Sequence, residues 1–279
     1  MSSPSRTWFI TGCSSGFGRA IAEAALLAGD QVIATARHKQ DLELLEHLGA
    51  GRCQGFVLDI TDAAQVQAVL AEAASVTGRL DVLVNNAGYG LIGAVEECSE
   101  AQIRRNMETN FFGTLNVIRA ALPTLRQQKS GHIVTISAAA AVSNYAGFGI
   151  YGAAKAAVEA LHESLHAELL PHGLKVTLVQ PGPFRTGFIS RGLDHAEAMP
   201  EYAGTAGKFA NYLKVVDGKQ PGDPEKAAEL IVKMVHEGQA PLRLPLGKYV
   251  VQKIRTTAAN RLRELEAWEQ AARDTDFSA

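Results

Sequence analysis

Residues 7–18 read TWFITGCSSGFG, an apolar run that passes directly into a loop with glycines at positions 12, 16 and 18. The run has the composition of a buried strand, and Arg19–Ala28 then have helical spacing. Glycines at this junction let the backbone approach a pyrophosphate, although their G-x-x-x-G-x-G spacing differs from the familiar G-x-G-x-x-G. The helix N-terminus supplies free N–H donors. The stretch predicts a phosphate-binding strand, loop and helix, with turn geometry alone as the alternative.

Short apolar runs alternate with helix-period segments along most of the chain. The predicted strands are Thr7–Thr11, Gln31–Thr35, Gln54–Leu58, Asp81–Val84, His132–Ser137 and Lys175–Val179. The predicted helices are Arg19–Ala28, Asp41–Leu48, Ala63–Ser75, Glu100–Gln127 and Tyr151–Leu170. Because such alternation forms right-handed βαβ units, we expect an α/β fold: a doubly wound parallel sheet with helices on both faces.

The pattern changes after Val179. Residues Pro181–Pro224 are rich in Gly and Pro and contain one helical patch, Tyr202–Val215, which predicts a lid or binding segment; a disordered insertion is the alternative. The elements expected to follow are a helix near Glu225–His236, a strand at Leu242–Leu244 and a charged helix that ends near Trp268 and Arg273. We expect one domain over residues 1–279, divided into a core (about 5–186), a substrate loop (about 187–224) and C-terminal elements (225–279).

The composition excludes several classes of protein. The chain has 279 residues, with 27 Lys and Arg against 29 Asp and Glu, so it lacks the basic surplus of a protein that binds nucleic acid or an anionic membrane. Cys13, Cys53 and Cys98 form no C-x-x-C pair and suit a reducing compartment. No apolar run reaches the ~18 residues of a membrane span, and the N-terminus has no signal-like region. We expect a cytoplasmic protein with neither nucleic acid nor membrane as partner.

The end of the second predicted strand indicates which nucleotide is bound. The adenosine ribose is expected there, about 20 residues beyond the glycine loop, and an acid at this point selects NAD by bonding the 2′-hydroxyl. Residues 34–39 read ATARHK, with the basic cluster Arg37-His38-Lys39 and no carboxylate. Because arginine binds a 2′-phosphate in a bidentate manner, NADP(H) is favoured over NAD; a solvated loop role for Arg37 is the alternative.

Four further segments follow the glycine loop in order: Asn85–Gly88, Asn110, Tyr151–Lys155 and Pro181–Thr186. Together with that loop, and over Thr11–Thr186, they make the chain resemble the short-chain dehydrogenase/reductase family. The resemblance implies a Rossmann-type fold and hydride transfer between a nicotinamide and a small-molecule substrate. It also implies a homodimer or homotetramer built on the helix that carries the tyrosine and the helix before it.

Tyr151 and Lys155 are the predicted catalytic pair. Their i, i+4 spacing places them on one helix face, where the lysine ammonium would lower the phenol pKa from its reference value near 10. By the resemblance, the tyrosine exchanges a proton with the substrate oxygen, the lysine also holds the nicotinamide ribose, and Asn110 keeps a proton-relay water in place. The implied cofactor contacts are Gly12, Ser14, Ser15, Gly16, Phe17, Gly18, Arg37, Asp59, Ile60, Asn86, Ala87, Gly88, Tyr151, Lys155, Pro181, Gly182, Phe184 and Thr186.

One position departs from the family pattern. The family's substrate-orienting serine lies thirteen residues before the tyrosine, and in this chain that position is Ala138. Loss of one such donor typically costs about 10²–10³ in rate. Either the alanine is an inactivating substitution, or Ser137 or Ser143 takes over the role, or the protein binds its cofactor with little catalysis. Ser137 should lie on the opposite strand face, which makes simple replacement doubtful, and we favour the first explanation.

His162-Glu163-Ser164-Leu165-His166 matches the zinc-protease signature H-E-x-x-H, in which two histidines share a helix face and the glutamate acts as base. The match lies well inside the Tyr151 helix, and the chain downstream offers only His172, His195 and His236 as further histidine ligands. Surface or interface packing is favoured over metal binding, and we expect no metal.

The sequence therefore predicts an NADP(H)-dependent oxidoreductase that interconverts a carbonyl and an alcohol. Several residues of the later segment suggest an apolar substrate pocket, with lid packing as the alternative: Phe184, Phe188, Ile189, Leu193, Tyr202 and Phe209. The rival hypothesis is a non-enzymatic dinucleotide-binding sensor or scaffold of the same fold. Ala138 motivates that rival, and the intact Asn110, Tyr151 and Lys155 oppose it.

Overall fold

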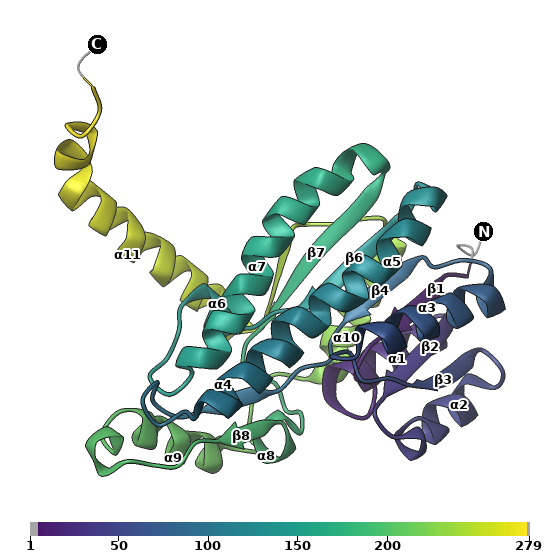
Figure 1. Ribbon diagram of the computed structural model, residues 1–279, viewed down its shortest axis with the longest axis horizontal. Coiled ribbons are helices and arrows are strands. Elements are labelled where there is room, and N and C mark those ends of the chain that lie inside the picture. Colours follow the sequence, from purple (N-terminus) through teal and green to yellow (C-terminus); the bar gives the residue numbers. More distant parts are fainter. Residues whose placement is uncertain (1–4, 278–279) are drawn as a thin grey trace.

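A seven-stranded parallel sheet forms the centre of the molecule (Figure 1), in the computed structural model that describes residues 5–277. Its strands are β1 (Thr7–Ile10), β2 (Gln31–Ala36), β3 (Cys53–Val57), β4 (Val82–Asn85), β6 (Gly131–Ile136), β7 (Leu174–Pro181) and β9 (Arg243–Leu246). They lie in the order β3-β2-β1-β4-β6-β7-β9, and every neighbouring pair is parallel. The expected α/β doubly wound sheet is confirmed, with strand ends within two residues of those predicted.

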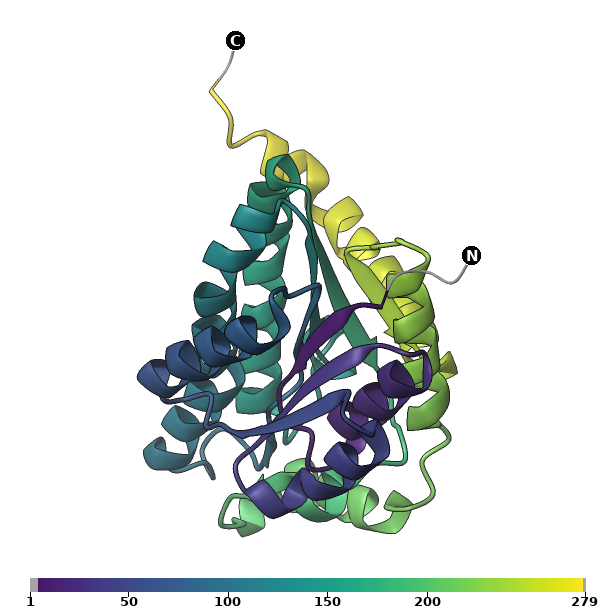
Figure 2. The same cartoon turned by 90° about the vertical axis from the view of Figure 1, so that its right-hand side faces the viewer.

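Helices cover both faces of this sheet (Figure 2). The helices are α1 (Gly16–Leu27), α2 (Glu43–Gly49), α3 (Ala63–Thr77), α4 (Glu100–Met107), α5 (Thr114–Gln128), α6 (Ala139–Val142), α7 (Gly149–Leu169), α8 (Phe188–Arg191), α9 (Ala206–Val216), α10 (Pro224–His236) and α11 (Lys248–Arg273). One core cluster joins α1 and α10 to the sheet, and a second joins α3, α5 and α7 to its other face. The first helix begins at Gly16 rather than Arg19, so the last glycines of the loop form its first turn.

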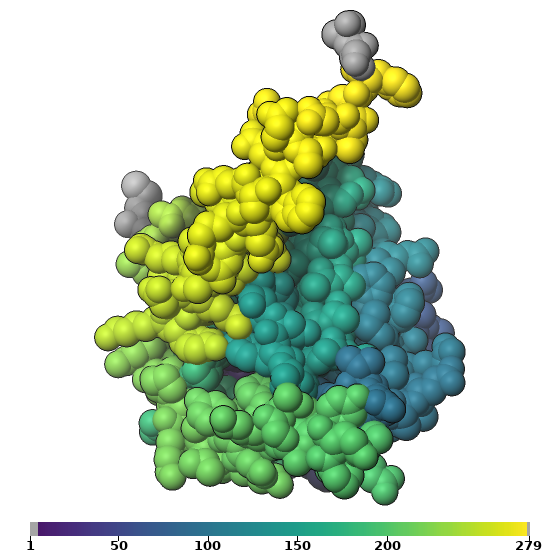
Figure 3. Space-filling view, turned by 90° about the vertical axis from the view of Figure 1, so that its left-hand side faces the viewer, coloured from purple at the N-terminus to yellow at the C-terminus, as the bar shows by residue number. Residues whose placement is uncertain are grey.

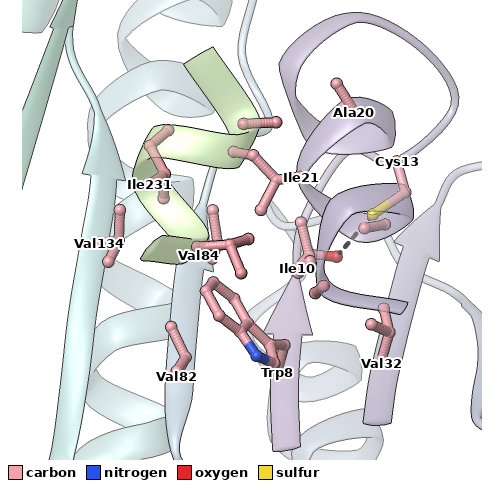
Figure 4. Packing of buried hydrophobic residues seen from close by; sticks show 14 of the residues in the cluster. Trp8, Ile10, Cys13, Ala20, Ile21, Val32, Val82, Val84, Val134 and Ile231 are labelled. Atoms are coloured by element: carbon pink, nitrogen blue, oxygen red, sulfur yellow. Dashed lines mark hydrogen bonds between the residues drawn. The ribbon is translucent and has the colours of Figure 1, made fainter. Parts of the chain in front are cut away.

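The first strand is anchored from both sides. Trp8 and Ile10 pack toward α1 and α10, where Ile21 and Ile231 meet them (Figure 4), while Phe9 packs toward α3 and α5. The three strand side chains have no exposed surface, and full burial of each contributes about 1.5–3 kcal/mol. This anchoring determines where the chain leaves β1 and enters the glycine loop.

A wide turn interrupts the helix predicted over Glu100–Gln127. The π-helical segment Glu108–Gly113 joins α4 to α5, so one nearly continuous helix contains a local change of pitch. Such turns are frequent at functional sites, and this one contains Asn110.

A second, two-stranded parallel sheet was missed by the sequence patterns. It pairs β5 (Gly90–Ile92) with β8 (Leu193–His195), so the segment after β7 contains a strand as well as α8 and α9. Three-residue strands carry too little periodicity to be recognised. The pairing holds the predicted substrate loop against the residues that follow β4.

The last helix projects from the rest of the molecule (Figures 1 and 3). Val250, near its beginning, is the only residue of α11 that is fully buried in the described part of the chain. Across residues 5–277 the structure contains no helix that is both long and apolar enough to span a bilayer.

Candidate active site

The glycine loop needs each of its three glycines for a different local reason. Gly12 and Gly16 have φ angles of +71° and +60°, which other residues adopt only at a cost. A methyl group on Gly18 would lie 2.4 Å from both Asn86 Nδ2 and the Gly12 carbonyl oxygen. The loop leads into α1, whose N-cap Ser15 makes no side-chain capping bond and whose first turn carries no acid. This helix end is therefore suited to an anion.

Asn86 and Thr11 tie the loop to the end of β4. The Asn86 side-chain amide donates to the Thr11 and Gly12 carbonyl oxygens at 2.9 and 3.0 Å. Thr11 Oγ1 accepts from the backbone N–H groups of Asn86 and Ala87, each at 3.0 Å. The Asn85–Gly88 motif thus holds the glycine loop in shape, whatever contacts it makes with a ligand.

At the end of β2, the three basic residues have different surroundings. Lys39 Nζ donates to Glu46 Oε1 at 2.6 Å and to the Gly55 carbonyl oxygen at 3.1 Å. Arg37 and His38 are exposed and directly follow the strand. The lysine is already engaged within the protein, whereas Arg37 and His38 face solvent at the end of β2.

The two residues predicted to border the adenine, Asp59 and Ile60, also have different surroundings. Asp59 Oδ1 accepts from the N–H and the hydroxyl of Thr61, so its carboxylate holds a local turn. Ile60 is buried, and a methyl group on Gly113 would lie 2.7 Å from its side chain. Ile60 is therefore a packing residue of the π-helical turn as well as a candidate cofactor contact.

The segment after β7 closes against the glycine loop. The rings of Phe184 and Phe17 lie 5.0 Å apart, and the Cβ position of Gly16 is 3.5 Å from the Thr186 side chain. Gly182, which follows Pro181 at the end of β7, donates its N–H to the Leu246 carbonyl oxygen at 3.0 Å. The structure therefore brings together the loop and the Pro181–Thr186 motif, as the sequence predicted for a shared site.

Lys155, Asn110 and Gly88 meet at the other end of the site. A methyl group on Gly88 would lie 2.5 Å from Asn110 Oδ1 and 3.4 Å from Lys155 Nζ. Asn110 donates to the Tyr89 and Asn106 carbonyl oxygens at 2.8 and 3.1 Å, while its own Oδ1 is buried without a donor among residues 5–277. Any larger residue at position 88 would fill the space between these polar atoms.

The pKa of Tyr151 differs from the sequence prediction. Tyr151 and Lys155 are both buried on α7, and burial raises the phenol pKa above its ordinary value rather than lowering it. Burial also lowers the pKa of Lys155 to about 8, and its ammonium donates to the Ile136 carbonyl oxygen at 3.0 Å. Loss of hydration on burial is the cause of both shifts in pKa.

Ala138 and Ser137 face different surroundings. Ala138 belongs to an apolar cluster with Ile92, Phe148 and Tyr151. Ser137 Oγ donates to the buried Glu159 Oε1 at 2.6 Å, two helical turns (about 12 Å) beyond Tyr151 along α7. Its hydroxyl is thus directed away from Tyr151, which opposes the hypothesis that Ser137 replaces the missing serine.

The Glu159 cluster behind the site was not anticipated. Gln180 Nε2 donates to both Glu159 oxygens at 2.8 and 3.0 Å, and Arg243 Nε lies 3.3 Å from Oε2. These residues come from α7, β7 and β9, which are far apart in the sequence, and no motif links them. Their bonds hold the middle of α7, the end of β7 and the start of β9 together.

Aromatic side chains surround Tyr151, and only some of them were predicted. The Tyr151 ring lies 5.2 Å from Phe148 and 5.7 Å from Phe188, and Phe209 lies 5.0 Å from Phe148. Leu193 packs against the same cluster. Two other predicted pocket residues are engaged elsewhere: Phe184 packs on Phe17, and Tyr202 donates its hydroxyl to Glu96. Phe148 was missed because a single aromatic residue before a helix carries no signal.

Within the H-E-x-x-H match, His162 lies in the core, whereas Glu163 is exposed. His162 Nδ1 is 2.7 Å from the Val158 carbonyl oxygen and Nε2 is 2.7 Å from Thr135 Oγ1. Burial lowers the pKa of His162 to about 4, so the neutral ring donates through Nδ1 and accepts from Thr135. Over residues 5–277 no group of three or more potential ligands could hold a metal ion.

This arrangement fits a dinucleotide. An uncapped helix end follows a glycine loop, Arg37 lies at the end of β2, and the small Gly88 leaves space beside Lys155 and Asn110. Such a fold and site define the class of dinucleotide-dependent oxidoreductases.

Comparisons with known proteins agree with that class. Residues 6–195 match the family model described as short chain dehydrogenase. A 3-ketodihydrosphingosine reductase from Bacteroides thetaiotaomicron is 35% identical over 243 residues, which cover 86% of this chain and 87% of that protein. A short-chain dehydrogenase from Streptomyces avermitilis has a crystal structure with a TM-score of 0.92 and 41% identity, covering 98% of this chain and all of that one. A short chain dehydrogenase/reductase from Burkholderia phymatum in complex with NAD has a TM-score of 0.81 and 25% identity, covering 91% and 93%.

The chain belongs to the short-chain dehydrogenase/reductase family of NAD(P)-dependent oxidoreductases. The resemblance inferred from the glycine loop and the four later motifs is confirmed.

Proposed function

We propose that this protein is an NADP(H)-dependent oxidoreductase that interconverts a carbonyl and an alcohol on an apolar small molecule. The observation that carries the proposal is the placement of Tyr151, which lies inside an aromatic cluster and one helical turn from Lys155. Lys155 and Asn110 both lie close to Gly88. The substrate oxygen would lie at the Tyr151 hydroxyl, with the apolar part of the substrate among the neighbouring rings. We propose that residues 1–279 form one domain, in which residues of about 187–224 form the substrate loop.

The residues of this chain have distinct parts in the mechanism. A bound nicotinamide supplies or accepts the hydride. Tyr151 donates its phenolic proton to the substrate oxygen during reduction and takes it back during oxidation. Lys155 stabilises the phenolate through its ammonium charge and holds the nicotinamide ribose, while the buried Asn110 orients the groups beside it. The surrounding rings exclude water, which strengthens these interactions.

The nucleotide preference is tested at Arg37. A guanidinium beside a 2′-phosphate contributes about 1.5–3 kcal/mol, so Arg37→Ala should lower kcat/KM for NADPH by about 10–100-fold and leave that for NADH unchanged. Paired steady-state kinetics with both cofactors provide the measurement, and Lys39→Ala, which breaks only the contacts to Glu46 and Gly55, is the matched control. Equal losses with NADPH and NADH would contradict the assignment.

The aromatic cluster supports an apolar substrate. Phe148, Phe188, Phe209 and Leu193 pack around the Tyr151 side of the site. The Bacteroides relative is named for reduction of a keto compound, 3-ketodihydrosphingosine. We propose ketones, aldehydes or secondary alcohols with a bulky apolar part as the substrate class, and a homo-oligomer in the cytoplasm as the working form.

The second candidate function is a dinucleotide-binding sensor or scaffold with little catalysis. Ala138 lies in the apolar cluster and Ser137 is bonded to Glu159, so Ser137 does not take the place of the missing serine, and Ser143, at the end of α6, is the other candidate. A screen of carbonyls and alcohols with NADPH or NADP⁺, performed on the protein and on Ala138→Ser, decides between the two. We expect turnover that rises by about 10²–10³ in Ala138→Ser if the alanine is inactivating. Cofactor binding without turnover in either form would favour the sensor.

A further inference from the structure

The outer part of α11 presents an apolar face that is not covered by residues 5–277. Val250, Ile254, Ala258, Leu262, Leu265 and Trp268 recur at intervals of three or four residues, which places them on one side of the helix. At the base of the helix this side packs on the molecule, because Val250 is fully buried and Ile254 is half-buried. Farther out the same side is exposed, with 55% of Leu262, 57% of Leu265 and 72% of Trp268 accessible.

The base of the helix is held firmly, so its outer part extends in a defined direction. The Tyr249 hydroxyl is 2.8 Å from that of Tyr145, and Lys253 Nζ lies 3.7 Å from the centre of the Tyr145 ring. The helix packs against α6 and β9 and then extends past them as an arm (Figure 3). At 26 residues it is about 40 Å long.

The arm is basic in its first half and acidic in its second half, a distribution that is complementary to an antiparallel copy of the same helix. Residues 248–263 contain five Lys or Arg and no Asp or Glu, whereas residues 264–276 contain five Asp or Glu and one Arg. The ion pair found within α11 joins Arg273 and Glu269, both in the acidic half. The change of sign falls between Arg263 and Glu264, beside the exposed Leu262 and Leu265.

We propose that α11 is an association arm that pairs, antiparallel, with α11 of a second copy of this chain. A two-fold axis near Leu262 and Leu265 would set the basic half of each helix beside the acidic half of the other. The same pairing covers the exposed leucines and Trp268, and tryptophan is one of the residue types enriched among the residues that contribute most binding energy at protein interfaces. This surface is separate from α5 and α7 and does not depend on the proposed reaction.

The apolar contact is tested by the variant Leu265→Glu/Trp268→Glu. Its mass in solution, measured by sedimentation velocity over a range of micromolar concentrations, is expected to be half that of the parent protein. The control is Leu44→Glu, because Leu44 is an exposed leucine on α2 and its replacement should leave the mass unchanged. A parent protein that is monomeric throughout, or a mass that Leu265→Glu/Trp268→Glu leaves unchanged, overturns the proposal.

The antiparallel direction is tested by charge reversal. Arg255→Glu/Arg261→Glu/Arg263→Glu makes both halves acidic, and Glu264→Arg/Glu266→Arg/Glu269→Arg makes both halves basic. Each variant alone should lose the association, and a mixture of the two should form a one-to-one heterodimer. Self-association of either variant at the parent's strength overturns the proposal, as does binding of a monomeric parent to vesicles of anionic phospholipid. NADPH binding by every variant is measured as the readout of folding and is expected to stay unchanged.

Discussion

The two ends of the site are built by different means. At the cofactor end, main-chain geometry dominates: positive φ angles at Gly12 and Gly16, and the bonds that Asn86 makes to the backbone of the loop. At the substrate end, rings from separate segments, Phe148, Phe188 and Phe209, meet around Tyr151. Backbone geometry tolerates few residues at each position, whereas a pocket of side chains can change its shape by substitution. The glycine-loop end is therefore suited to a ligand that does not vary, such as a cofactor, whereas the aromatic end can be adapted to a particular substrate.

The largest effect is expected for Tyr151→Phe, which should lower turnover without changing cofactor binding. Tyr151→Phe removes the hydroxyl but keeps the ring that packs on Phe148 and Phe188. Turnover should fall by about 10²–10⁴, the usual contribution of a general acid or base. NADPH affinity, measured by fluorescence titration, should stay the same because the backbone-held end of the site is unchanged. A variant that keeps its rate would remove Tyr151 from the mechanism.

An intermediate effect is expected at Gly18, which tests how rigid the cofactor end is. Gly18→Ala forces a methyl group against Asn86 and the Gly12 carbonyl oxygen, so the free energy of unfolding should fall by about 1–3 kcal/mol and NADPH binding should weaken. Gly204→Ala is the matched control, because the Cβ position of Gly204 has no neighbour within 4 Å, and it should change stability by less than about 0.5 kcal/mol. Urea unfolding measures both. An unchanged free energy of unfolding and unchanged NADPH binding in Gly18→Ala would contradict the prediction that the loop is rigid.

The smallest expected effect is the contribution of Lys155 to the pH dependence of the free energy of unfolding. Lys155 lies between the cofactor end and the substrate end of the site. Its pKa is about 8 in the folded protein and ordinarily 10.5, so the unfolded chain binds more protons between these values. The contribution of Lys155 to the free energy of unfolding is therefore least favourable below pH 8 and rises with pH through this window. Between about pH 8 and pH 9 the rise should be about 1 kcal/mol. Urea unfolding of cofactor-free protein should show it, relative to Lys155→Met, and parallel pH profiles would contradict it.

Most of the sheet and the cofactor end were predictable because their signals are local. An apolar run followed by spaced glycines indicates a strand and a tight turn, as at β1, and short apolar runs predicted a strand near each of the other six strands of the sheet. The family resemblance places the substrate-orienting serine thirteen residues before Tyr151, a position that Ala138 occupies. Ser137 and Ala138 follow β6 rather than lying in it, and their side chains nevertheless have different surroundings.

The other features of the site could not be predicted from the sequence, because they depend on contacts between distant parts of the chain. The bond from Ser137 to Glu159, the meeting of Gly88 with Asn110 and Lys155, and the rise in the Tyr151 pKa all require several elements to be packed first. The β5–β8 pair and the uncovered face of α11 have the same origin. The sequence by itself determined the periodic elements and the glycine turn, because each follows from neighbouring residues, and the family resemblance supplied the proposed catalytic residues. Only the tertiary structure decided which side chains are buried together, because burial and the pKa shifts it causes are properties of the packed whole.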